Sequence, residues 1–157
     1  MLDFVRQSEF SAQVFRTLWS HTGDAGYQDY EGRLYFVDRV TDSMRRRGEN
    51  ISSMEVEDEI NQHPDVLECA VFPVWAENSE QEVMVVITPQ PGVTLEPEEL
   101  IRFLDQRMAY FMIPRYIEFT DAIPKTPTGK MEKYKLRTVG ISSNTWDRVA
   151  AGIKLSR

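Results

Sequence analysis

Apolar residues along the chain gather in short runs that have the composition of β-strands. Residues 34–37, 66–74, 83–88 and 115–119 are rich in aromatic or β-branched side chains and lie between polar stretches, which is typical of strands. The turn residues at 29–32 come just before the first run and indicate a β-hairpin there. The pattern therefore predicts one hairpin and three further strands.

Three helices are predicted between and after these runs. Ser52 and Glu55 form an S-x-x-E capping box before the first helix, in which each side chain satisfies a backbone N–H of the first turn, and Pro64 ends that helix. Pro97 suits the first turn of the second helix. The apolar stripe of this second helix follows helical spacing at Leu100, Ile101, Leu104 and Met108. A short basic helix begins near Glu132.

These elements divide the chain into three parts. The order β-α-β-β-α-β-loop-α closes within 42–138 and predicts an α+β domain, a small mixed sheet of about three strands with helices packed on it. At its start, 41–53 is polar and basic and contains glycine, which indicates a linker or loop with room for one short strand. Residues 1–41, which begin with loosely helical apolar spacing over 1–20, and the tail 139–157 lie outside this pattern.

Composition excludes several classes of protein. Of the 157 residues, 41% are hydrophobic, which is enough for a core and argues against wholesale disorder. No apolar run approaches the ~20 residues of a membrane span, and the first 20 residues do not resemble a secretory signal. One cysteine and two histidines argue against a disulfide framework and a metal site. The net charge of −7 argues against nucleic-acid binding. We therefore expect a cytoplasmic protein.

Basic residues nevertheless gather in two places. Arg45–Arg47 is one, and 123–137, with five basic residues against one acid, is the other. Such patches on an acidic protein can attract a polyanionic small molecule such as a nucleotide. The Gly-Lys pair ending at Lys130 is not a phosphate loop, because Pro124 and Met131 replace the glycine and the Ser/Thr that this motif needs. Lys130 is instead a lysine on a proline-punctuated loop, either simply solvated or delivered to an anionic centre as a point charge.

Five motifs follow one another along the chain. They are Thr22-Gly23-Asp24, Asp38-Arg39-x-x-Asp42, Arg47-Gly48-Glu49-Asn50-Ile51-Ser52, Glu55-x-Glu57 and Pro124-Lys125-Thr126-x-Thr128-Gly129-Lys130. In this order and spacing they resemble the C-terminal part of adenylate-forming enzymes, which include acyl-CoA synthetases, luciferases and the adenylation domains of peptide synthetases. The resemblance covers 10–138, and the third motif is most similar to the carnitine/crotonobetaine CoA ligase type.

The resemblance implies a two-step reaction. An enzyme of this family uses ATP with Mg²⁺ to convert a carboxylic acid into an acyl-adenylate and pyrophosphate, and CoA then displaces AMP. A small C-terminal lid domain takes a different pose over a large N-terminal domain in each step, and the large domain binds most of the ATP. The resemblance makes 42–138 this lid domain and 1–41 the end of the large domain with the hinge.

Individual residues match the family's functional positions. By resemblance, Lys130 is the catalytic lysine that bridges the carboxylate and the α-phosphate during adenylation. Asp24 and Arg39 match the residues that contact the nucleotide's ribose. Thr41 stands at the hinge position, followed by Asp42.

A second group of residues matches the route by which CoA enters. The residues that would line the path of its pantetheine arm are Arg45, Gly48, Glu49 and Asn50. The segment 111–114 matches a stretch that often carries a basic residue near the CoA nucleotide, but here its residues are apolar.

The resemblance leaves three readings open. The family's phosphate loop, acyl pocket and adenine-binding residues would lie upstream, so the chain by itself is expected to be an inactive fragment of an acyl-CoA ligase. The alternatives are a free-standing interaction module with the lid fold, and a fragment of an adenylation domain that loads a carrier protein. The sequence does not indicate the acyl substrate.

Overall fold

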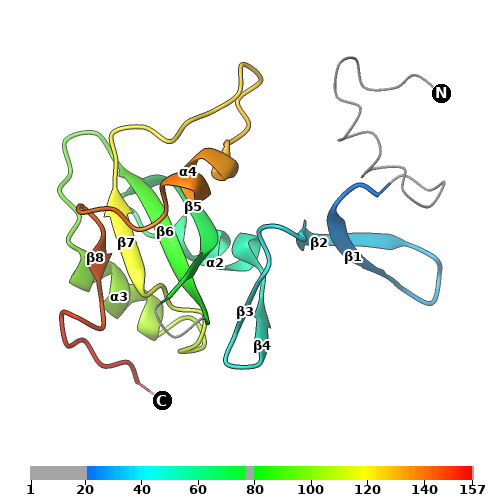
Figure 1. The fold of residues 1–157 in the computed structure, drawn as a ribbon, viewed down its shortest axis with the longest axis horizontal. Helices are drawn as coiled ribbons and strands as arrows, with labels where there is room; N and C mark the ends of the chain where they lie inside the picture. The colour runs from blue at the N-terminus through cyan, green and yellow to red at the C-terminus, as the bar shows by residue number, and fades with distance from the viewer. Residues whose placement is uncertain (1–20, 77–79, 157) are drawn as a thin grey trace. The chain divides into compact units, whose positions relative to one another are not determined.

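The chain divides into two compact units between Thr41 and Asp42. The computed structural model describes residues 21–76 and 80–156 (Figure 1). The helical spacing predicted for 1–20 lies outside the described residues.

A β-hairpin makes up the described part of the first unit. Strands β1 (Asp24–Gln28) and β2 (Leu34–Arg39) pair antiparallel. The Asp29 side chain closes the turn, where its Oδ1 accepts hydrogen bonds of 2.9 Å from the backbone N–H groups of Glu31 and Arg33. The predicted hairpin is thus confirmed.

The second unit is built on a four-stranded mixed sheet. Its strands are β5 (Val66–Trp75), β6 (Gln81–Pro89), β7 (Tyr116–Phe119) and β8 (Trp146–Asp147), and they lie in that order. The β6–β7 pair is parallel and the other two pairs are antiparallel. The parallel pair requires a crossover, which passes through α3 (Pro97–Asp105). The predicted α+β class with a small mixed sheet is confirmed.

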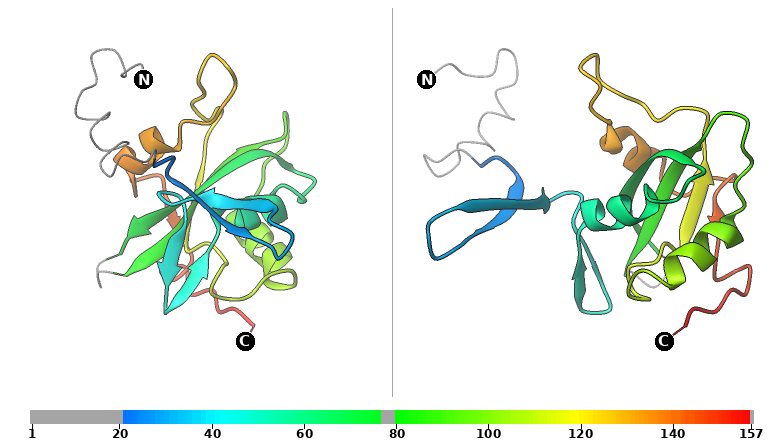
Figure 2. Two further views of the ribbon diagram at one scale, coloured as in Figure 1. Left: turned by 90° about the vertical axis from the view of Figure 1, so that its right-hand side faces the viewer. Right: turned by 180° about the vertical axis from the view of Figure 1, so that it is seen from behind.

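Both faces of this sheet are covered. Side chains of α2 (Ser53–Ile60) and α3 join the core on one face, and α4 (Lys133–Val139) packs on the other (Figure 2). Along β5, Val71 lies in the first core and Phe72 in the second, and both are fully buried. A strand buried on both faces is expected to be apolar throughout, which is why 66–74 forms an apolar run.

The segment 139–157, predicted as a tail, contributes a strand. Trp146 and Asp147 form β8 and pair with Ile117 and Tyr116 of β7. A bidentate ion pair supports this edge, because the Arg115 guanidinium donates to both carboxylate oxygens of Asp147 at 2.9–3.3 Å. These contacts are long-range, so no local pattern marks the strand.

The polar segment 41–53, predicted as a linker or loop, contains a second hairpin. Strands β3 (Met44–Arg46) and β4 (Glu49–Ile51) pair antiparallel around a two-residue turn. Both turn residues have positive φ, 52° at Arg47 and 88° at Gly48. A two-residue turn with this backbone matches the twist of the strands.

The predicted capping box of α2 does not form. The helix begins after Ser52 as expected, but the Ser52 side chain makes no capping hydrogen bond. The first turn is held from another element, since the Nζ of Lys133 donates to the Ser53 hydroxyl at 3.0 Å.

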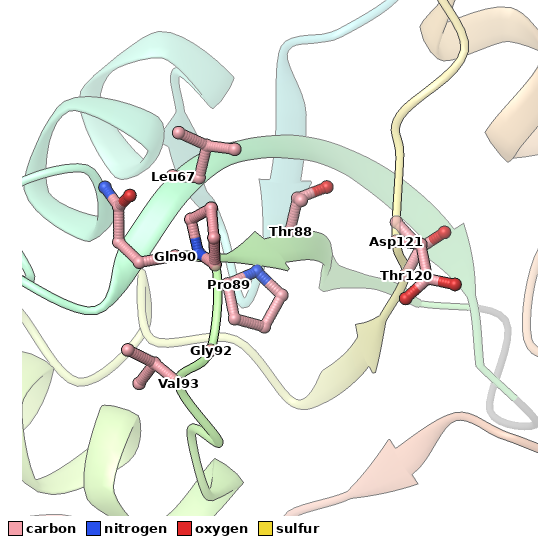
Figure 3. A pocket seen from close by; sticks show the side chains of 9 residues that line it. Leu67, Thr88, Pro89, Gln90, Gly92, Val93, Thr120 and Asp121 are labelled. Carbon is pink, nitrogen blue, oxygen red and sulfur yellow. The ribbon is translucent and has the colours of Figure 1, made fainter.

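A pocket of about 360 Å³ opens at the sheet edge where the parallel strands β6 and β7 end (Figure 3). Thr88 and the turn after β6 line one side, and Thr120 and Asp121 after β7 line the other. Asp121 is the only charged residue of the lining, so the pocket lacks the cations that a phosphate-bearing molecule needs. The Thr88 hydroxyl is buried and forms no hydrogen bond with any described residue.

Replacing Thr88 by Val should therefore stabilise the protein. A buried hydroxyl without a partner costs about 1–3 kcal/mol, and Val retains the β-branched shape that a strand favours. We expect the free energy of unfolding in urea to rise by about 1 kcal/mol. Thr120→Val is the matched control, because the Thr120 hydroxyl donates to the Ala122 carbonyl at 3.2 Å. If both substitutions changed the free energy of unfolding equally, the assignment of the Thr88 hydroxyl as buried without a partner would be contradicted.

Candidate functional site

The loop that carries Lys130 is a hydrogen-bonded turn. Lys125 and Met131 form an antiparallel bridge at its base. Within the turn, the Thr126 N–H donates to the Lys130 carbonyl at 2.8 Å, and the Lys130 N–H donates to the Thr126 hydroxyl at 3.1 Å. Gly129 adopts a φ of 82°, which favours glycine. The turn presents the Lys130 side chain to solvent, where its ammonium is available to an anion.

A cluster of charged side chains anchors α4, which follows this turn. The Nζ of Lys133 lies 2.7 Å from Glu57 Oε1 and 4.0 Å from Asp42 Oδ2. Arg137 pairs with the other carboxylate oxygen of Asp42. We call these four residues the Asp42 cluster. It joins the first residue of the second unit to α2 and to the helix beside the Lys130 turn.

Burial makes the Asp42 cluster sensitive to the loss of a partner. The side chains of Asp42, Glu57 and Lys133 are 12%, 15% and 14% exposed. Glu57 Oε1 also accepts the Val71 N–H of β5 at 2.6 Å. Removing one member of a buried ion pair typically costs 3–5 kcal/mol, because the other charge stays buried without compensation. The cluster therefore fixes α4 against the sheet.

No motif in the sequence marks Lys133 and Arg137 as site residues. Their spacing of four places both side chains on the same face of α4. This shared face is the one feature of the sequence that could have indicated a common binding partner. Their partners lie far away in the sequence, so the spacing alone does not reveal the cluster.

Asp24 and Arg39, predicted as nucleotide contacts, lie opposite each other in the first hairpin. The Nε of Arg39 lies 2.9 Å from Asp24 Oδ1, and Arg39 also donates to the Thr22 carbonyl at 3.2 Å. The Arg39 and Asp24 side chains are 57% and 37% exposed. An exposed pair of this kind contributes little to stability, so both groups can exchange partners with a ligand's hydroxyl groups.

The predicted hinge residues stand on either side of the unit boundary. Thr41 is the last residue of the first unit and Asp42 the first of the second. Thr41 is exposed, whereas Asp42 is buried in the cluster that bears its name.

The four residues predicted to line the CoA path share the hairpin β3–β4. Arg45 is paired with Asn50, Glu49 begins β4, and Gly48 forms the turn. All four are exposed. A Cβ on Gly48 would meet no atom within 4 Å, so the backbone φ, not close packing, requires glycine here.

One trio among the described residues brings potential metal ligands together. Ligand atoms of His63, Asp65 and Glu99 lie within 4.8 Å of one another. However, His63 is buried and its Nδ1 accepts the Asp65 backbone N–H at 3.2 Å. A neutral imidazole with Nδ1 as the acceptor carries its proton on Nε2. The ring then has no free lone pair for a cation, and we assign no metal to the trio.

Cys69 is a core residue. Its thiol donates weakly to the Asn61 side chain at 3.4 Å, and burial raises the pKa of the thiol far above its usual range. A thiol that stays protonated is a poor nucleophile.

Residues 55–130, which contain the Lys130 turn, match the family model described as the AMP-binding enzyme C-terminal domain. The chain carries this domain. The match includes most of α2, all of α3 and the strands β5, β6 and β7, and it ends at Lys130. The resemblance to adenylate-forming enzymes is thereby confirmed.

Relatives of this C-terminal domain include CoA ligases. A crotonobetaine/carnitine–CoA ligase of Shigella dysenteriae serotype 1 is 37% identical over 119 residues, which cover 76% of this chain and 23% of that protein. The solved structure of the anthranilate CoA ligase AuaEII in complex with anthranoyl-AMP is 30% identical, with a TM-score of 0.75, over 97% of this chain and 29% of that chain. The ATP-bound MatB structure from Rhodopseudomonas palustris is 29% identical, with a TM-score of 0.75. The match covers 87% of this chain and 27% of that chain.

The chain thus spans about a quarter of the length of the proteins that it matches. Within the part of the chain that the structure describes, no helix is long and apolar enough to cross a membrane.

The different surroundings of the lysines near the turn predict different chemical reactivity. Lys133 must leave its buried pair before it can react, and each 1.4 kcal/mol of opening lowers the rate about tenfold. We therefore expect an N-hydroxysuccinimide ester to label Lys130 at least about tenfold faster than Lys133, as followed by peptide mass spectrometry. Lys135, 51% exposed on the same helix, is the matched control: the hydrogen bond with Glu132 raises its pKa and slows its labelling relative to Lys130, but it should still react faster than Lys133. If Lys130 were labelled as slowly as Lys133, the exposure of the Lys130 side chain on this turn would be contradicted.

Proposed function

We propose that this chain is the C-terminal lid domain of an AMP-forming acid–thiol ligase. The complete enzyme converts a carboxylic acid and MgATP into an acyl-adenylate and pyrophosphate, and then transfers the acyl group to CoA. The observation that carries the proposal is the exposed Lys130 on a hydrogen-bonded turn beside an anchored helix, within a domain whose relatives are CoA ligases. The names of those relatives make small organic acids the first substrates to test.

In the first half-reaction, Lys130 offsets charge. A carboxylate must approach the α-phosphate of ATP, and two anions repel each other. An ammonium placed between them stabilises the transition state and holds the reacting groups in position. Asp24 accepts hydrogen bonds from the ribose hydroxyls, and Arg39 contacts the same region of the nucleotide.

In the second half-reaction, the β3–β4 hairpin lines the route of CoA. The residues that carry this role are Arg45, Gly48, Glu49 and Asn50. The Lys130 turn and the β3–β4 turn project from opposite ends of the second unit in all three views (Figures 1 and 2). One reaction centre therefore cannot hold both at once. This arrangement supports a rotation of the lid about Thr41 and Asp42 between the two half-reactions.

The first hairpin has an apolar surface suited to a large partner domain. Its exposed apolar side chains include Leu34 at 83%, Phe36 at 56% and Val40 at 61% exposure. Contiguous exposed apolar side chains are typical of an interaction surface. We propose that they pack on the large N-terminal domain that supplies the rest of the ATP site and the acyl pocket.

The two turns should affect different half-reactions. In an enzyme that contains both domains, Lys130→Ala should lower acid-dependent ATP–pyrophosphate exchange by about 10²–10³, the usual cost of a lost charge contact in a transition state. Thioester formation from a supplied acyl-adenylate should be retained. Gly48→Leu should show the reverse pattern, because a bulky side chain obstructs the pantetheine path.

Two controls separate these roles from simple destabilisation. Lys135→Ala removes an exposed lysine from α4. Gly92→Leu introduces the same side chain at a remote turn with a similar φ of 78° and the same open space. Both controls should retain both half-reactions. If Gly48→Leu and Gly92→Leu reduce both half-reactions alike, backbone strain explains the loss and the assignment of Gly48 fails.

A further inference from the structure

The turn of the β3–β4 hairpin has no apolar anchor of its own. Each strand of the hairpin has three residues, and an isolated hairpin is marginally stable in water. Its apolar side chains, Met44 and Ile51, are buried at the base of the hairpin, away from the turn. From residue 45 to residue 50, Arg46 alone has a buried side chain, 3% exposed, and the other five residues are exposed. The position of the turn therefore depends on a buried arginine.

The Arg46 guanidinium reaches two other segments of the second unit. One of its terminal nitrogens donates to the carbonyls of Phe111 and Ile113, at 2.7 and 3.3 Å, in the segment before β7. Its Nε lies 2.7 Å from Oε2 of Glu82 on β6, whose side chain is 7% exposed. We call these three contacts the Arg46 tether. Because a guanidinium is planar and contacts its acceptors in fixed directions, the tether gives the end of β3 one defined position.

The charges of the Arg46 tether are buried at a cost. Well-packed apolar residues often give equal or greater stability in place of a buried ion pair. What such a pair does favour is a single geometry, because a charge that slips from its partner stays buried and uncompensated. The next two residues along the chain are Arg47 and Gly48, which form the turn. Any shift of the Arg46 side chain is therefore passed directly to the turn.

We propose that Arg46 is a positioning residue for the second half-reaction. It holds the β3–β4 turn where Gly48, Glu49 and Asn50 line the path of CoA, and it does so from a buried site that does not touch the substrate. This inference rests on the function proposed for the hairpin. If CoA binds only when the turn is in place, its apparent affinity falls in proportion to the fraction of molecules with a positioned turn. Loosening the turn should therefore raise the KM for CoA and spare the first half-reaction.

Two substitutions of Arg46 separate the position of the turn from the stability of the unit. Arg46→Met removes the whole tether and leaves Glu82 with the more distant Arg115, at 3.9 Å, so it should lower the urea midpoint of unfolding. Arg46→Lys keeps a positive charge for Glu82 but cannot donate in the same directions. It should therefore recover most of the urea midpoint without restoring the position of the turn.

Steady-state kinetics of an enzyme that contains both domains test the proposal. We expect both variants to raise the KM for CoA at least about tenfold, because a misplacement of about 1 Å can cost about 10²-fold. At saturating CoA, kcat should fall less than about threefold, since CoA then selects the positioned turn. ATP–pyrophosphate exchange should change by less than about twofold.

Lys133→Met is the matched control, because it also replaces a buried cation by Met, but in the anchor of α4. It should show the reverse pattern, with slower ATP–pyrophosphate exchange and a KM for CoA within about twofold of the wild-type value. The proposal fails if Arg46→Lys restores the KM for CoA together with the urea midpoint. It also fails if Arg46→Met and Lys133→Met reduce the two half-reactions alike, since Arg46 then acts only through stability.

Hydrogen exchange in the 157-residue chain tests the Arg46 tether without any ligase activity. We expect the backbone amides of residues 44–51 to exchange at least about tenfold faster in Arg46→Lys, because the hairpin then opens locally. The amide of Val71, which donates to Glu57 Oε1, should change by less than about twofold. Unchanged exchange over 44–51 would overturn the proposal. A two-domain enzyme that does not use CoA would instead overturn the proposed function, and the exchange result would still decide whether Arg46 fixes the hairpin.

Discussion

The Asp42 cluster is the interaction on which the position of the Lys130 turn depends. Helix α4 has only seven residues and no fully buried side chain, and helices this short are marginal by themselves. Its hydrophobic contact with the sheet comes from the partly buried Leu136. Lys133 and Arg137 add directional contacts to Glu57 and Asp42, and the cost of burying these charges is offset only while the pairs are intact. The cluster thus gives α4 one defined position.

This anchoring explains how a small domain can hold the Lys130 turn in one defined position. The Lys130 turn starts from a fixed helix and closes through backbone hydrogen bonds, so its side chain is delivered by a rigid body instead of a free loop. The β3–β4 turn belongs to the same unit and projects from its opposite end. In the proposed reaction, a rotation of the whole unit exchanges one turn for the other, and neither turn needs to refold.

Local sequence predicted the elements whose signals are local. The apolar runs of β5 and β6 and the stripe of α3 marked those elements, because burial on the sheet and on one helix face leaves a pattern in neighbouring residues. The β3–β4 hairpin was missed because an arginine, Arg47, occupies a turn position with positive φ. Strand β8 was missed because two residues carry no periodicity, and its pairing rests on the distant Arg115.

The residues of the candidate site also fall into those that local motifs predict and those that only long-range contacts reveal. Asp24, Arg39 and the residues of the Lys130 turn stand in recognisable motifs, and the structure places Asp24 beside Arg39. The ion pairs of Lys133 and Arg137 cross 76 and 95 residues of sequence, and three-dimensional structure was required to find them.

A double-mutant cycle on Glu57 and Lys133 tests the anchoring of α4 most directly. Glu57→Gln keeps an acceptor for the Val71 N–H, and Lys133→Met keeps most of the side-chain volume, so the cycle isolates the charge pair. From the free energies of unfolding, we expect a coupling energy of about 1–3 kcal/mol. The pair of Glu132 and Lys135 at the start of the same helix, in which Lys135 is 51% exposed, should give less than about 0.5 kcal/mol. A coupling between Glu57 and Lys133 no larger than that of Glu132 and Lys135 would contradict this anchoring.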